Sequence, residues 1–124
     1  MLTQSHRLTS GTAFAEAVRR GRRAGTGSLV LHLAVPAHDA DDTPVRVGFV
    51  VSKAVGSAVT RNLVKRRLRS LARERLGSLP GAAMLVVRAL PAAASTSYAT
   101  LAADFDSALD RLLRRTAGTG GLPR

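Results

Sequence analysis

The pattern of apolar positions along the chain predicts three β-strands. In residues 29–35, leucine and valine alternate with a second set of positions that includes His32, which is typical of a half-buried strand. Residues 45–52 are more continuously apolar, so we expect a central strand there. After a proline-glycine turn, residues 83–87 form the third predicted strand. The basic, glycine-rich segment 22–27 is expected to be a loop with at most a short edge strand.

Three other segments have the apolar spacing of helices. We expect the first between a cap at Ser10 or Thr12 and residue 20, and the second between a cap at Ser57 and a stop at Gly77. A third helix is predicted to begin near Ser97. Its apolar stripe consists of Tyr98, Leu101, Phe105, Ala108, Leu109 and Leu112.

These elements predict one α+β domain over residues 1–117, a small sheet with helices packed against it, and a flexible tail at 118–124. The length of 124 residues fits a single domain, and 45% apolar residues are enough for a core. Because only 3% of the residues are aromatic, we expect alanine, valine and leucine to build that core. The absence of cysteine excludes disulfides, thiolate zinc sites and cysteine nucleophiles.

The charge of the chain indicates a polyanionic partner. The formal net charge is +11 and the isoelectric point is about 11.8, which favours nucleic acid or an anionic membrane over a neutral ligand. Charge spread evenly for solubility would be the alternative, and its placement along the chain decides between them. No apolar run approaches the roughly 18–20 residues of a membrane span, and the first 25 residues lack the apolar core of a signal peptide. We therefore expect no membrane partner and a cytoplasmic protein.

The predicted second helix concentrates this charge on one face. Residues 60–75 contain seven basic residues and one acid, Glu74. At about 100° per residue, Val64, Leu68, Leu71 and Ala72 fall on one side. A second group of side chains, with Arg67 pointing elsewhere, gathers into an arc of roughly 140°. This basic arc consists of Arg61, Asn62, Lys65, Arg66, Arg69 and Arg73.

A solvated amphipathic face is the other interpretation of the basic arc. Such a face normally interleaves both signs of charge so that residues four apart attract each other. Here Arg61 and Lys65, Lys65 and Arg69, and Arg69 and Arg73 repel each other instead. Guanidinium groups donate two hydrogen bonds to one phosphate and also stack on bases, so the pattern favours nucleic-acid binding.

The segment V-G-F-V-V-S-K-A-V-G-S-A-V-T-R-N-L-V-K-R-R-L-R, residues 47–69, closely resembles the protein subunit of bacterial ribonuclease P. The motif is specific because it joins a strand, a Ser-Lys pair, a glycine turn and a patterned basic helix at fixed spacing. The resemblance covers roughly residues 7–115. It implies an αβββαβα fold with a small mixed sheet and an arginine-rich crossover helix, shared with a ribosomal-protein domain and with domain IV of a translational elongation factor.

The resemblance also implies a function. In that family the protein assists a catalytic RNA that removes the 5′ leader from precursor tRNA, and its arginine-rich helix docks on that RNA. This role carries over to Arg61, Asn62, Lys65, Arg66 and Arg69, with Lys53 as a further phosphate contact. Leu63 stands where many relatives have a basic residue, and Arg67 or Arg73 could compensate. Gly56 matches the lead-in to the helix and is expected to serve backbone geometry.

The family further holds the single-stranded leader in a cleft between its first helix and the sheet, partly on aromatic side chains. Phe14 matches one such position, although it could equally be a core residue of its helix. Val18 and His32 stand where relatives often have a large aromatic residue. Base stacking contributes about 1–3 kcal/mol per base, so we expect this cleft to bind more by shape and charge than by stacking.

The sequence predicts no active site carried by the protein itself. Its acids lie mostly in one loop (Asp39, Asp41, Asp42) and on the last helix, and His6, His32 and His38 have no metal-ligand spacing. We therefore expect the RNA to supply the chemistry, with Mg²⁺ on the RNA and no cofactor on the protein alone. A binding module without catalytic connection, such as a ribosomal protein or RNA chaperone, is an alternative. DNA binding is disfavoured because no zipper and no short helix one turn before the basic helix is present.

Overall fold

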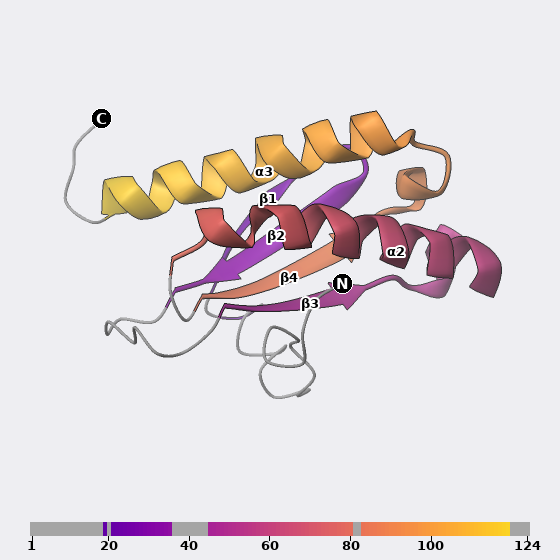
Figure 1. Cartoon of the computed structure of the whole chain (residues 1–124), viewed down its shortest axis with the longest axis horizontal. Helices are drawn as coiled ribbons and strands as arrows, with labels where there is room; N and C mark the ends of the chain where they lie inside the picture. The colour runs from indigo at the N-terminus through magenta and orange to yellow at the C-terminus, as the bar shows by residue number, and fades with distance from the viewer. Residues whose placement is uncertain (1–18, 20, 36–44, 81–82, 120–124) are drawn as a thin grey trace.

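The computed structural model describes residues 19, 21–35, 45–80 and 83–119. Within these ranges the chain forms one sheet, two long helices and three short 3₁₀ turns (Figure 1). The predicted first helix, with Phe14 and Val18, and the predicted aspartate loop lie outside the described residues. In chain order the elements are β1 (Arg22–Gly25), β2 (Leu29–Ala34), β3 (Arg46–Val50), η2 (Lys53–Val55), α2 (Ala58–Arg75), η3 (Leu76–Ser78), β4 (Met84–Ala89), η4 (Pro91–Ala94) and α3 (Tyr98–Thr119).

The four strands form a mixed sheet in the order β1-β2-β4-β3. β1 pairs with β2 and β2 pairs with β4 antiparallel, whereas β3 and β4 run parallel. A parallel pair needs a crossover connection, and α2 provides it between β3 and β4. The order of the described elements confirms the βββαβα part of the predicted fold, and segment 22–27 does contain a short edge strand.

The prediction that residues 45–52 form a central strand was wrong. β3 lies at the edge of the described sheet, whereas β2 and β4 each have a neighbouring strand on both sides. β3 is apolar for another reason, because it has apolar contacts on both of its faces. Val47 belongs to the main core, and the half-buried Val50 packs against a second small cluster formed by Ala34 and Val86. Apolar contacts on both faces give the same continuous apolar pattern as a position in the middle of a sheet.

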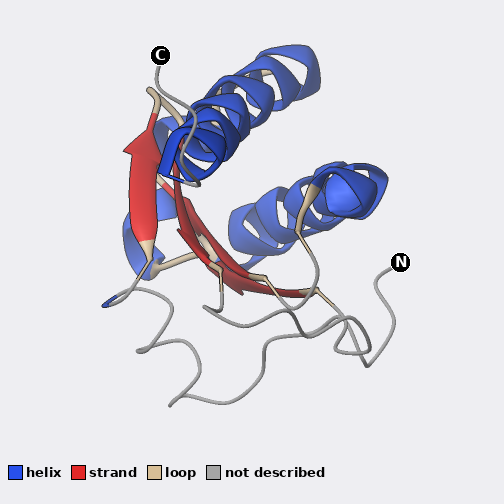
Figure 2. Cartoon of the chain, turned by 90° about the vertical axis from the view of Figure 1, so that its left-hand side faces the viewer, coloured by secondary structure: helices blue, strands red, loops and turns tan. Residues whose placement is uncertain are grey.

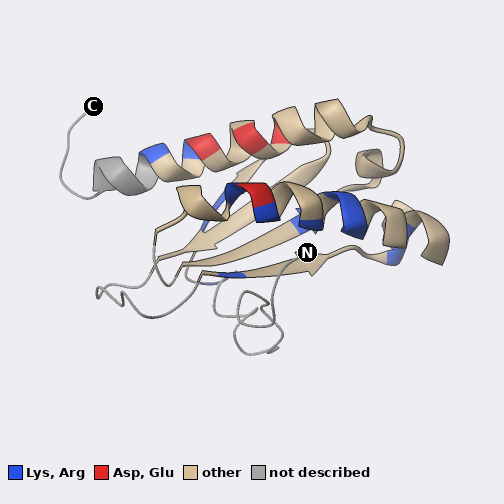
Figure 3. Cartoon of the chain, in the orientation of Figure 1, with Lys and Arg blue, Asp and Glu red and all other residues tan. Residues whose placement is uncertain are grey.

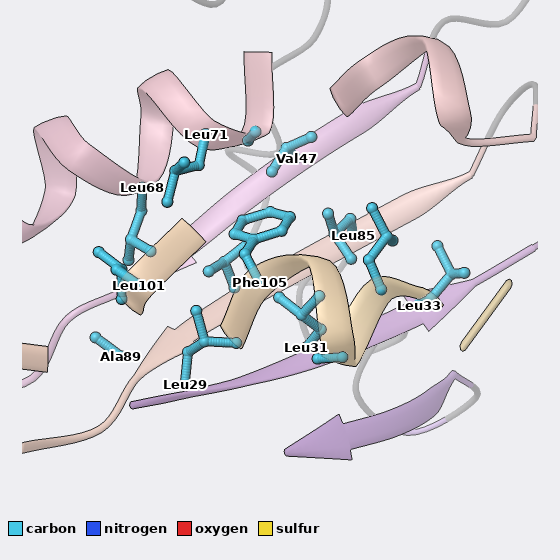
Figure 4. Packing of buried hydrophobic residues seen from close by; sticks show 14 of the residues in the cluster. Leu29, Leu31, Leu33, Val47, Leu68, Leu71, Leu85, Ala89, Leu101 and Phe105 are labelled. Carbon is cyan, nitrogen blue, oxygen red and sulfur yellow. The ribbon is translucent and has the colours of Figure 1, made fainter. Parts of the chain in front are cut away.

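Both long helices cover the same face of the sheet (Figure 2). α3 lies over β1 and β2, and α2 packs against β3. The core between the helices and the sheet is mainly aliphatic, as the composition predicts, with Phe105 as its large aromatic side chain (Figure 4). Leu29 and Leu31 from β2 belong to the same core cluster as Leu68 from α2, and all three are inaccessible to solvent. The face of each helix that is turned toward the sheet is therefore fixed.

The ends of the helices largely follow the predicted signals. Ser57 caps α2, and Ser97 accepts a hydrogen bond from the backbone N–H of Thr100 at the start of α3. Gly77, however, lies inside the 3₁₀ turn η3 and not in a left-handed capping conformation. In the apolar stripe of α3 only Tyr98 reaches the surface, where its hydroxyl donates to Ser70 Oγ. α3 continues to Thr119, two residues into the predicted tail, and residues 120–124 lie outside the described part.

Candidate nucleic-acid interface

The lead-in to α2 sets where the helix begins. Ser57 Oγ accepts a hydrogen bond from the backbone N–H of Thr60 at 3.3 Å and donates to the Thr60 hydroxyl at 3.2 Å. Gly56 before it has φ 154° and ψ −160°, a region that is essentially restricted to glycine. A Cβ at this position would lie 3.1 Å from Thr60 Cγ2. The predicted role of Gly56 in backbone geometry is confirmed. Lys53 lies on the short turn η2 before this glycine and is exposed.

α2 divides into a buried side and a basic side, as the periodicity predicts. Its buried residues are the four named from the sequence, Val64, Leu68, Leu71 and Ala72, each at most 1% exposed. The members of the basic arc all lie outside that buried side. Asn62, Arg66 and Arg73 are exposed, whereas Arg61, Lys65 and Arg69 are half-buried. Figure 3 shows the basic positions distributed along the length of α2.

The cations of the basic arc are not neutralised within the described part of the chain. None of the five forms an ion pair or a side-chain hydrogen bond there. Arg61 Nε is even shielded from solvent without a hydrogen-bond partner. The like-charged neighbours four residues apart, such as Lys65 and Arg69, therefore remain without intramolecular compensation. Such a surface is suited to a polyanion that lies alongside the helix, parallel to its axis.

The acids of α3 are engaged elsewhere. Asp104 accepts a 2.6 Å hydrogen bond from the buried Ser28 hydroxyl in the β1–β2 turn. Asp110 pairs with Arg114 on the same helix at 3.5 Å. Asp106 pairs with Arg75, and these hydrogen bonds lower the pKa of Asp106 below its usual value. All three carboxylates have partners outside the basic arc, so none of them compensates the cations of that arc. The acidic positions of α3 can be followed in Figure 3.

Two arginines of α2 belong to the fold rather than to the basic arc. Arg67 donates from Nη1 to the backbone carbonyl of Thr96, which ties α2 to the segment before α3. Arg75 binds both carboxylate oxygens of Asp106, donates to the Leu71 carbonyl and lies 5.7 Å from the centre of the Phe105 ring. Sequence periodicity had placed Arg67 outside the arc. It gave no sign of the role of Arg75, because Asp106 is 31 residues away.

His32 lies on the second face of the sheet, which we define as the face turned away from α2 and α3. On β2 it alternates with Leu31 and Leu33, which point into the main core. Arg23 on β1 pairs directly with His32, whereas Arg88 on β4 pairs with Val30 and is therefore a diagonal neighbour of His32. Burial, then the charges of Arg88 and Arg23, lower the pKa of His32 below its usual value. Its Nδ1 is buried and has no hydrogen-bond partner. Because Phe14 and Val18 lie outside the described residues, the predicted grouping of these three side chains stays a prediction.

The described residues contain no group of three or more histidine, cysteine, aspartate or glutamate side chains arranged to hold a metal ion. In the same residues, no helix is long and apolar enough to cross a membrane. Guanidinium and ammonium groups on α2, and guanidinium groups on the second face of the sheet, are suited to the recognition of anions.

In the part of the chain that the structure describes, a four-stranded mixed sheet has two helices on one face, and one of them carries cations without partners in that part. These features define a class of small basic α+β proteins. A family model for ribonuclease P matches residues 2–113. The protein component of ribonuclease P from Nocardioides sp. is 58% identical over 118 residues, which cover 95% of this chain and all of the relative. The corresponding protein from Streptomyces avermitilis is 54% identical, covering 91% of this chain and 96% of the relative.

Solved structures share the fold. The ribonuclease P protein of Staphylococcus aureus superimposes with a TM-score of 0.73 at 21% identity, covering 85% of this chain and 93% of that one. The protein from Thermotoga maritima gives a TM-score of 0.69 at 23% identity, covering 87% and 96%. The chain belongs to the ribonuclease P protein family. It is the protein component of an endoribonuclease that processes tRNA, and its partner is the ribonuclease P RNA.

Proposed function

We propose that the basic arc of α2, together with Lys53, binds the ribonuclease P RNA. The observation that carries this proposal is a row of five cations, without partners among the described residues, on one side of a helix whose other side is fully buried. Burial of Val64 and Leu68 fixes the rotation of α2 about its axis, so the cations are held toward a ligand before it arrives. Pre-organised donors lose less conformational freedom on binding.

The proposed role of the complex is removal of the 5′ leader from precursor tRNA, with precursor tRNA as the second partner and the cytoplasm as the location. The RNA performs the chemistry with its own Mg²⁺, while the protein binds no cofactor by itself. The second face of the sheet contacts the single-stranded leader through His32 and its arginine neighbours Arg23 and Arg88. Support for this part is the charge of that face and the unpartnered Nδ1 of His32.

A salt titration of RNA binding tests the role of the basic arc. About six phosphate contacts predict a slope of log affinity against log salt of about −4 to −5. Arg66→Ala and Arg69→Ala should each make this slope shallower by about one unit. Arg114→Ala is the matched control, because Arg114 is 67% exposed on α3 and lies outside the arc. If both α2 variants keep the parental slope, the basic arc does not bind the phosphates.

A cleavage assay tests the role in processing. Addition of the protein to the ribonuclease P RNA should permit precursor-tRNA cleavage at a lower Mg²⁺ concentration, since bound cations replace part of the ionic screening. Cleavage that is unchanged by the protein would contradict that role. Equal affinity for unrelated structured RNAs would instead favour a general RNA-binding module.

A further inference from the structure

Part of the basic arc lines a shallow, open hollow whose apolar lining phosphate binding alone does not require. It has a volume of about 570 Å³ and lies on the outer surface of α2. Six side chains line it, two apolar, one amide and three cationic. They are Val59, Leu63, Asn62, Lys65, Arg66 and Arg69.

The apolar part of this hollow is exposed to an unusual degree. Val59 is 80% exposed, whereas the other large apolar residues exposed in the described part, Val35 and Tyr98, are each 38% exposed. Leu63 follows Val59 by one helical turn and is half-buried, so the two side chains form one continuous apolar strip. Phosphates are strongly hydrated anions, so their binding does not bury an apolar strip between cations. Contact with a flat, weakly hydrated surface does remove the strip from water, which is favourable.

From this arrangement we propose that the hollow receives one unpaired nucleobase of the ribonuclease P RNA. The apolar strip of Val59 and Leu63 contacts the face of the base, and the Asn62 amide, which has donors and an acceptor, contacts its edge. Lys65, Arg66 and Arg69 bind the flanking phosphates. Proteins recognise RNA bases mainly in loops and bulges, where the base is free of its stack, because side chains do not reach base edges in the deep groove of an RNA duplex.

The proposal deepens the proposed function and rests on it, because the cations around the hollow are those of the basic arc. Charge complementarity selects the occupant. The three cations around the hollow attract an anion, and the apolar strip favours an anion that has an uncharged flat part. A nucleotide meets both conditions. A regular RNA duplex that binds only through its backbone would leave the strip exposed.

Two truncations separate base contact from phosphate contact. Val59→Ala and Leu63→Ala should each weaken binding of the ribonuclease P RNA about three- to tenfold, because buried methyl groups are lost. The salt slope should stay at the parental value, since no phosphate contact is removed. Val35→Ala is the matched control, because Val35 is an exposed valine that does not line the hollow, and the affinity of this variant should equal that of the parent. Neither α2 position is fully buried, so both variants should fold.

Chemical probing of the RNA gives an independent readout. Dimethyl sulfate and a carbodiimide together report on the pairing edges of all four bases. We expect at least one unpaired base that reacts in free RNA to be protected at saturating parental protein and at saturating Val35→Ala. The same base should react again with Leu63→Ala. Parental affinity and an unchanged footprint for both truncations would overturn the proposal.

The same experiments separate failure of this inference from failure of the proposed function. If Arg66→Ala and Arg69→Ala make the salt slope shallower while Val59→Ala and Leu63→Ala have no effect, the arc binds RNA and the hollow is empty. If the arginine variants also keep the parental slope, the RNA does not bind on this face, and the proposed function fails with the inference.

Discussion

Substitution of Gly56 by alanine should destabilise the protein more than a substitution at a surface position usually does. Gly56 has φ 154° and ψ −160°, where residues with a side chain are strained by about 1–3 kcal/mol. The new Cβ would also lie 3.1 Å from Thr60 Cγ2 and 3.2 Å from Thr60 Cβ, so the first turn of α2 would have to move by a few tenths of an ångström. The total free energy of unfolding of a domain is about 5–15 kcal/mol, so the loss is a large fraction of it.

Urea and thermal unfolding measure this loss. For a domain of this size we expect the melting temperature to fall by about 4–12 °C. Gly77→Ala is the matched control, because a Cβ at Gly77 meets no atom within 4 Å and its φ is not positive. That variant should keep or slightly increase the stability, since alanine restricts the unfolded chain.

A double variant separates the two causes. Thr60→Ser removes the nearest atom, Cγ2, and leaves the hydroxyl that interacts with Ser57. In the Thr60→Ser background, Gly56→Ala should therefore cost less than in the parent, but its cost should remain above zero because the backbone strain persists. If Gly56→Ala is as stable as the parent, or if Thr60→Ser changes nothing, the reasoning from this backbone geometry is refuted.

Three further substitutions have defined outcomes. Asp106→Asn should lower the free energy of unfolding by about 0.5–1 kcal/mol, because the pair with Arg75 is partly exposed and screened. The pKa of Asp106 is lowered in the folded state, so this contribution to stability is present above about pH 4 and is lost as the pH falls through the folded pKa. Urea unfolding at several pH values measures this loss. The lowered pKa of His32 favours its neutral form in the folded protein, so the parent should lose stability as the pH falls below about 6.5, and His32→Gln should lose less over that range. Leu68→Ala removes a side chain with no solvent exposure and should cost about 2–5 kcal/mol in the same unfolding assay, with an unchanged salt slope of RNA binding where the variant is folded.

Local features of the sequence were sufficient to predict the two sides of α2. Val64, Leu68, Leu71 and Ala72 were assigned to the buried side from the helical period alone, and all four are buried. This works because the direction of a side chain on a helix depends only on its position along that helix. The cap at Ser57 was predictable for the same reason, since its partner Thr60 is three residues away.

Features that depend on distant parts of the chain were not predictable in this way. Position within a sheet is one case, because β3 and the central β4 have similar apolar sequences but different numbers of neighbours. The role of Arg75 is another. In sequence it differs little from Arg73, and only the fold shows that one binds Asp106 on α3 while the other is exposed. The hollow at Val59 was also missed, because an exposed valine in a helix carries no pattern of its own.

The packing of α2 stabilises the helix, whereas the charge on its exposed side destabilises it. Repulsion between like charges four residues apart, as in Lys65 and Arg69, disfavours the helix by about 0.2–0.5 kcal/mol for each pair. No carboxylate of the described residues relieves it. The helix nevertheless forms because its other side buries four apolar residues against the sheet, and each fully buried leucine or valine contributes about 1.5–3 kcal/mol. The core therefore keeps these like charges close together, and relief of their repulsion would favour the RNA binding that we propose for this face.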